Sequence, residues 1–175
     1  MEIEKKYENY ANKLIIADAS PLIELNKLNK MDYLKKLFKE IYTTKTIEDE
    51  CNFILPKWIK IEEPQEISKN IINIGKIDEG ERSAIALAIE KNIIKKEQSC
   101  VILDQKGVRD KLKKRNIEID FIGLLKVFNL AYENNYITKE EVPNLIIQLK
   151  KNRFRMPKNA INIIYGDNKI KGKDR

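Results

Sequence analysis

The sequence predicts an α/β fold, a three-layer α/β/α sandwich with a mostly parallel central sheet. Short apolar runs such as Leu14–Ala17 and Cys100–Leu103 are bounded by polar segments, which is the pattern of strands buried on both faces. Segments with apolar residues at helical spacing lie between these runs. Strands that alternate with helices are joined by crossovers and run parallel, so helices are expected on both faces of the sheet.

The individual elements follow in order from this pattern and from its capping residues. Strands are expected at about Lys13–Ala17, Ile41–Thr43, Lys57–Ile61, Cys100–Leu103 and Ile117–Phe121. Helices are expected with Pro21 in the first turn and Asp18 or Ser20 near the cap, around Met31–Phe38, from a cap at Thr46 to about Ile54, and at Glu81–Lys91, Lys106–Arg115, Leu124–Glu133, Lys139–Lys151 and Lys158–Tyr165. Residues 67–77 are interpreted as a loop or short helix. We therefore expect one domain at 13–166, an N-terminal arm at 1–12 and a basic tail at 167–175.

Composition limits the chemistry. The chain has 175 residues, of which 35% are charged and 42% hydrophobic, as expected for a globular domain with a proper core. It contains no histidine, which excludes histidine zinc sites, Ser-His-Asp triads and histidine general bases. Cys51 and Cys100 lie in apolar patterns and are interpreted as core residues in a reducing cytoplasm. No stretch is long enough to span a membrane, and the N-terminus does not have the pattern of a signal peptide.

The formal net charge of +7 fits a surface that holds a polyanion, but it also fits a coding bias toward lysine. By itself the charge does not decide between a nucleic-acid partner and a solvated surface.

Four acidic residues interrupt the apolar pattern. Asp18 and Asp104 each follow a predicted buried strand, at the edge where open α/β sheets place their ligands. Glu50 shares a helical stripe with Ile47, and Glu81 lies on the apolar side of the clearest predicted helix. Carboxylates gathered in one crevice repel each other unless a cation lies among them. Taken singly, Asp18 also suits a helix cap and Glu81 a first-turn acid.

Four ordered segments resemble PIN domains, which are metal-dependent nucleases, and in particular a prokaryotic PIN subfamily without settled function. The segments are Ile16-Ala17-Asp18-Ala19-Ser20-Pro21-Leu22-Ile23, Asp78-x-Gly80-Glu81-x-x-Ala84-Ile85-x-Leu87-Ala88, Leu103-Asp104-x-x-x-x-Arg109 and Phe121-Ile122-Gly123-Leu124-Leu125. The resemblance covers about Leu14 to Tyr165 in the right order and spacing.

The resemblance implies a role for each of these acids. Asp18, Glu81 and Asp104 match metal ligands for Mg²⁺ or Mn²⁺, and Glu50 matches a further catalytic acid that binds metal or orients the attacking water. Ser20 matches a hydroxyl that supports the first aspartate or a metal-bound water. The implied reaction is phosphodiester hydrolysis, in RNA rather than DNA.

Four further residues bear on this site. Lys106 and Arg109 are candidates for binding substrate phosphate, and Arg109 also fits a brace for an acid or a solvated helix charge. Gln105 stands where many relatives carry another acid, which predicts weaker binding of a second metal. Asp120 is a possible replacement for that carboxylate, or a surface residue.

The alternatives divide into different classes of protein. A PIN fold with little or no catalytic activity would serve as a nucleic-acid-binding or assembly subunit. A toxin nuclease would instead be neutralised by an antitoxin that covers the crevice. A homodimer is also compatible with the sequence, whereas a dinucleotide-binding fold is disfavoured because no Gly-x-Gly-x-x-Gly follows the first strand.

Overall fold

The computed structural model describes residues 10–66, 75 and 77–166, except the side chain of Lys106. The chain divides into two compact units, Met1–Gly123 and Leu124–Arg175, and each is described by itself. The expected basic tail at 167–175 therefore lies wholly outside the described residues. Most of the expected N-terminal arm at 1–12 and most of the segment 67–77 also lie outside them.

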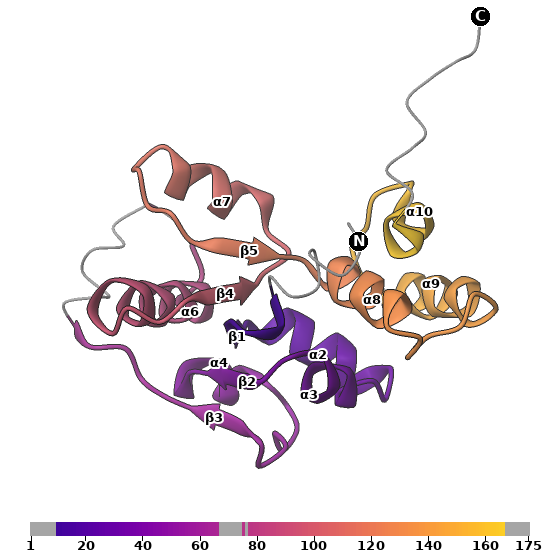
Figure 1. Ribbon diagram of the computed structural model, residues 1–175, viewed down its shortest axis with the longest axis horizontal. Coiled ribbons are helices and arrows are strands. Elements are labelled where there is room, and N and C mark those ends of the chain that lie inside the picture. The colour runs from indigo at the N-terminus through magenta and orange to yellow at the C-terminus, as the bar shows by residue number, and fades with distance from the viewer. Residues whose placement is uncertain (1–9, 67–74, 76, 167–175) are drawn as a thin grey trace, which may run out of the picture. The chain divides into compact units, whose positions relative to one another are not determined.

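The first unit is built on a five-stranded sheet in which every pair of neighbouring strands is parallel. The strands are β1 (Leu14–Ala17), β2 (Glu40–Thr43), β3 (Ile59–Ile61), β4 (Ser99–Ile102) and β5 (Asp120–Ile122). Their order is β3-β2-β1-β4-β5, with β1 in the centre (Figure 1). All four residues of β4 are buried, as expected for a strand covered on both faces. The predicted α/β sandwich with a parallel sheet is confirmed.

Helices connect these strands and supply the outer layers. They are α2 (Ala19–Lys27), α3 (Asp32–Leu37), α4 (Lys45–Glu50), α6 (Glu79–Ile89) and α7 (Lys106–Lys113). Helix α6 packs on β1 and β4, and nearly all of its residues are buried because apolar residues cover most of its circumference. It continues directly into the π-helix η1 (Glu90–Ile94).

Helix α4 differs from its prediction at both ends. Thr44 is its N-cap in place of Thr46, because the Thr44 hydroxyl accepts a hydrogen bond from the backbone N–H of Ile47 at 3.3 Å. The helix ends at Glu50, and Cys51 already has an extended backbone. Ile54 is 97% exposed, so it is not part of a buried stripe with Ile47. The apolar spacing suggested a longer helix than the cap and the extended Cys51 allow.

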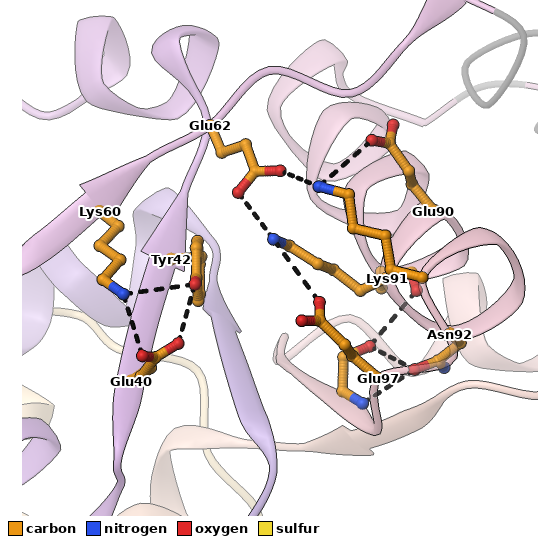
Figure 2. Close-up of polar contacts among 11 residues, drawn as sticks. Glu40, Tyr42, Lys60, Glu62, Glu90, Lys91, Asn92 and Glu97 are labelled. Atoms are coloured by element: carbon orange, nitrogen blue, oxygen red, sulfur yellow. Dashed lines mark hydrogen bonds and ion pairs between the residues drawn. The ribbon is translucent and has the colours of Figure 1, made fainter.

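A buried lysine ties η1 to the edge of the sheet (Figure 2). The Lys91 ammonium lies 2.7 Å from the Glu62 carboxylate, just beyond β3, and 4.3 Å from the ring centroid of Tyr42 on β2. Glu62 also pairs with Lys95 at 2.7 Å. The cation of Lys91 is thus neutralised where it leaves water, as a buried ammonium requires.

The second unit consists of α8 (Leu124–Glu133), α9 (Glu141–Lys151) and α10 (Ala160–Tyr165) in the described residues. Helix α10 packs on both α8 and α9. The buried side chain of Asn129 on α8 donates to the Ile164 carbonyl at 3.1 Å, which fixes the end of α10. Gly166 ends that helix at φ 77°, a left-handed conformation that favours glycine. Across both units, none of the helices described is long and apolar enough to cross a membrane.

Candidate functional site

Two of the predicted acids follow neighbouring strands at the carboxyl edge of the sheet. Asp18 comes directly after β1, and Leu103 and Asp104 follow β4. Ala17 is paired with Ile102, and the Asp18 N–H donates to the Ile102 carbonyl at 3.2 Å. The chain leaves β1 toward β2 on one side, and β4 lies on the other side, so this edge is a topological switch point where α/β folds bind ligands.

Asp18 is the most buried acid at this edge, with only 5% of its surface exposed. The pKa of its carboxyl is raised to about 7, chiefly by burial and also by the negative charges of Glu81 and Glu50, which together outweigh the lowering effect of the Ala19 and Ser20 backbone N–H groups. These interactions place Asp18 within electrostatic reach of both glutamates. Ser20 itself is exposed beside it.

Glu50 and Glu81 lie within electrostatic reach of each other because α4 packs against α6. A Cβ atom on Gly80 would lie 2.6 Å from Glu50 Oε1, so the glycine leaves room for that carboxylate. Glu81 is buried, and its carboxylate accepts a hydrogen bond from the Asp78 N–H at 3.4 Å. Burial raises the pKa of Glu81, and the charges of Asp78 and Glu50 add to the rise. Glu81 is therefore both a first-turn acid and a member of the acidic group.

A buried hydroxyl network fixes α4 and α6 beside Asp18, and the sequence did not predict it. The Thr44 and Ser83 hydroxyls lie 2.6 Å apart, and Ser83 donates to the Gly80 carbonyl at 2.7 Å. Thr43 donates to the Ala17 carbonyl, next to Asp18, at 3.0 Å. The signal for this network was a pair of threonines, Thr43 and Thr44, at the end of a strand at the ligand-binding edge.

Asp104 is exposed and lies beside Arg109. A Cβ atom on Gly123 would lie 2.8 Å from Asp104 Oδ1, so a second glycine makes room for an acid. Arg109 donates from Nη2 to the Leu103 carbonyl at 2.6 Å, which anchors the guanidinium directly before Asp104. Burial lowers the pKa of Arg109, and the charge of Asp104 opposes that change. The Nε atom of Arg109 is buried without a hydrogen-bond partner among the described residues.

Helix α7 contributes a second cation that the sequence did not single out. Lys111 lies close enough to Glu81 that its charge lowers the pKa of that carboxyl. Gln105 is the exposed N-cap of α7, and the side chain of Lys106 lies outside the part of the chain that the structure describes. Thus α7 directs Arg109 toward Asp104 and Lys111 toward Glu81.

Asp120 does not join these acids. It is the first residue of β5 rather than the last, because that strand begins three residues later than expected. It is paired with Cys100 in the sheet, and its carboxylate binds the Lys13 ammonium, which directly precedes β1. Its position is therefore the amino edge of the sheet, opposite Asp18.

The donor chemistry of the acidic edge fits a hard divalent cation. Its side chains are carboxylates, and the like charge that raises the pKa of Asp18 and Glu81 is relieved by a cation. In the described residues, no three acidic or thiol side chains form a group that could hold a metal ion. Mg²⁺ is commonly held by one or two carboxylates, with water and substrate completing its shell, so three converging side chains are not required.

The comparison with known families decides the classification of this fold. A family model described as DUF3368, PIN domain, matches residues 14–167. The chain belongs to this PIN-domain family. No curated protein and no solved structure matches it. The match spans both compact units of the PIN domain and confirms the resemblance seen in the sequence. PIN domains are generally nucleases, which bind nucleic acid and typically use divalent metals.

Proposed function

We propose that this PIN domain is a divalent-metal-dependent nuclease that hydrolyses phosphodiester bonds, with RNA as its substrate. The observation that carries the proposal is the buried Asp18 carboxylate, whose pKa is raised to about 7 by burial and by the negative charges of Glu81 and Glu50. Burying a carboxylate beside two others destabilises a fold, and such arrangements are typical of functional sites. Its place at the switch point of the sheet supports the same interpretation.

Asp18, Glu81 and Asp104 are the proposed ligands for Mg²⁺ or Mn²⁺, directly or through water. The metal would polarise the scissile phosphate and lower the pKa of a water molecule. Glu50 is exposed at this edge and held over Gly80, which suits a carboxylate that orients the attacking water. Ser20 is exposed beside Asp18, where its hydroxyl suits a supporting hydrogen bond.

The cations of α7 complete the proposed site. Arg109 donates to the Leu103 carbonyl next to Asp104. This anchored position suits a role in orienting the Asp104 carboxylate better than a role in binding substrate phosphate. Lys111 opposes the charge of Glu81 and is the better candidate to attract a substrate phosphate. Lys106 stays a candidate from the sequence alone.

A second function is favoured by one observation. Gln105 occupies a position where the resemblance to PIN domains leads one to expect another acid. This residue fits a PIN domain that binds nucleic acid, or assembles with another protein, without cleaving its ligand.

Cleavage of single-stranded RNA by the purified protein separates these functions. We expect cleavage with Mn²⁺ or Mg²⁺, none in excess chelator, and none in Asp18→Asn or Glu50→Gln. Asp49→Asn is the matched control, because Asp49 is next to Glu50 but pairs with Lys45 at 2.9 Å and is largely exposed. Activity that persists in chelator or in Asp18→Asn would rule out this centre, and binding without cleavage at any metal concentration would favour the second function.

A further inference from the structure

The second unit carries a strongly basic segment that the acidic site does not use. Residues 142–166 contain five basic residues and no acidic residue. We call these five the basic strip: Lys150, Lys151, Arg153, Arg155 and Lys158. All five are exposed. They fall within nine consecutive positions, so the charge density greatly exceeds that expected from the net charge of the whole chain.

The charges of the basic strip are not neutralised within the described residues. None of the ion pairs found there includes a residue of the strip. Some lysines of the first unit behave differently, since Lys91 and Lys95 share Glu62, and Lys60 pairs with Glu40 (Figure 2). Lys150 and Lys151 lie in the last turn of α9, where cations favour the helix dipole, but the other three residues lie beyond it.

The backbone gives the strip a defined shape. Arg153 adopts φ 60°, a left-handed conformation that reverses the chain after α9. Its N–H donates to the Lys150 carbonyl at 2.9 Å, and the Phe154 N–H donates to the Leu149 carbonyl at 2.9 Å. Phe154 and Met156 are partly buried and each directly follows an exposed arginine, so the apolar side chains anchor the segment while the cations face water.

We propose that the basic strip binds the phosphodiester backbone of a single-stranded nucleic acid, through residues other than those of the acidic edge. The choice of nucleic acid as the partner rests on the proposed function. Arginine guanidinium groups match phosphate oxygens in pairs, and closely spaced cations match a repeating anion. A membrane surface is a poorer match, because the large apolar residues exposed in this unit, among those described, are Tyr136 and Ile147, both outside the strip.

Binding measured without metal tests this proposal independently of cleavage. The dissociation constant for a fluorescently labelled single-stranded RNA is measured by anisotropy in chelator over a range of salt concentrations. The strip variant combines Arg153→Asn, Arg155→Gln and Lys158→Gln, with asparagine chosen because it tolerates the left-handed conformation. Loss of three phosphate contacts should weaken binding and reduce the slope of log K against log salt by about 2.

The matched control removes the same charge from the first unit, as Lys35→Gln, Lys39→Gln and Lys57→Gln, all exposed positions. We expect the control to keep the wild-type slope. Equal loss in both variants would mean that only net charge matters, and no loss in the strip variant would mean that RNA does not contact the strip. Either result overturns the proposal. Binding to anionic phosphatidylserine vesicles is measured as well, and a strip variant that loses vesicle binding but keeps RNA binding also overturns the proposal.

The two proposals fail separately. Asp18→Asn should abolish cleavage while it keeps RNA binding and its salt dependence. A strip variant that binds RNA normally contradicts the basic strip alone, whereas a wild-type protein that binds RNA but never cleaves it contradicts the proposed nuclease alone.

Discussion

Replacement of Asp18 by asparagine should stabilise the metal-free protein, even though it removes the central residue of the proposed site. Asp18 is buried, and its pKa is about 7 in place of the ordinary value of 3.8, chiefly because burial disfavours the charged carboxylate. Asparagine has nearly the same shape and carries no charge. Its amide oxygen can still accept hydrogen bonds from the Ala19 and Ser20 N–H groups, so the substitution removes the charge and keeps the packing.

The sign and size of the effect follow from the difference in pKa. The folded protein holds the Asp18 proton more tightly than the unfolded chain, so the wild-type protein loses stability as pH rises from about 4 to about 7. A difference of this size corresponds to about 4 kcal/mol above pH 7 and less than about 2 kcal/mol at pH 5. Since the side chain can rotate toward water, we expect Asp18→Asn to gain about 2 to 4 kcal/mol at pH 8 and less than about half of that gain at pH 5.

Urea unfolding in chelator at both pH values measures this gain. Glu118→Gln is the control, because Glu118 is exposed and lies outside the described helices and strands. Its stability should match that of the wild type at both pH values. An Asp18→Asn variant that is less stable than the wild type at pH 8, or that gains equally at pH 5 and pH 8, would refute the view that a buried charge destabilises this edge.

Two further substitutions test how the site is positioned. Gly80→Ala should reduce RNA cleavage strongly while it changes stability little, because the added Cβ would lie 2.6 Å from the flexible Glu50 carboxylate. The control Gly107→Ala, which has open space around its Cβ, should keep its activity. Equal cleavage by the two variants would contradict this role of Gly80. Ser83→Ala should destabilise the protein by about 1 to 3 kcal/mol in urea unfolding, because it leaves the buried Thr44 hydroxyl without that partner. A neutral Ser83→Ala would show that the hydroxyl pair does not hold α4 against α6.

The sequence predicted the architecture well because the strands are short apolar runs between polar segments. The predicted Lys13–Ala17 begins one residue before β1, and the predicted Cys100–Leu103 differs from β4 by one residue at each end. Periodicity gave poorer boundaries where local hydrogen bonds decide them. Cap formation by Thr44 begins α4 early, and the extended Cys51 ends it before Ile54.

The candidate site was predictable in part. The positions of Asp18 after a strand and of Glu50 and Glu81 on helical stripes marked them as candidates in the sequence. The structure brings these three acids within electrostatic reach of one another. Contacts that depend on packing between distant segments were not visible. The Thr44–Ser83 pair joins residues 39 positions apart, and the pairing of Asp120 with Lys13 joins residues 107 positions apart. No local pattern encodes such pairs.

Binding of Mn²⁺ to the purified protein tests the central claim most directly, because it needs no knowledge of the substrate. Isothermal titration calorimetry should detect saturable binding by the wild type and by Asp49→Asn, and binding should be lost or greatly weakened in Asp18→Asn. Thermal melts should show a matching rise in melting temperature with Mn²⁺ for the first two proteins alone. Equal Mn²⁺ binding by Asp18→Asn and the wild type, or no saturable binding by either, would contradict a metal site at this edge.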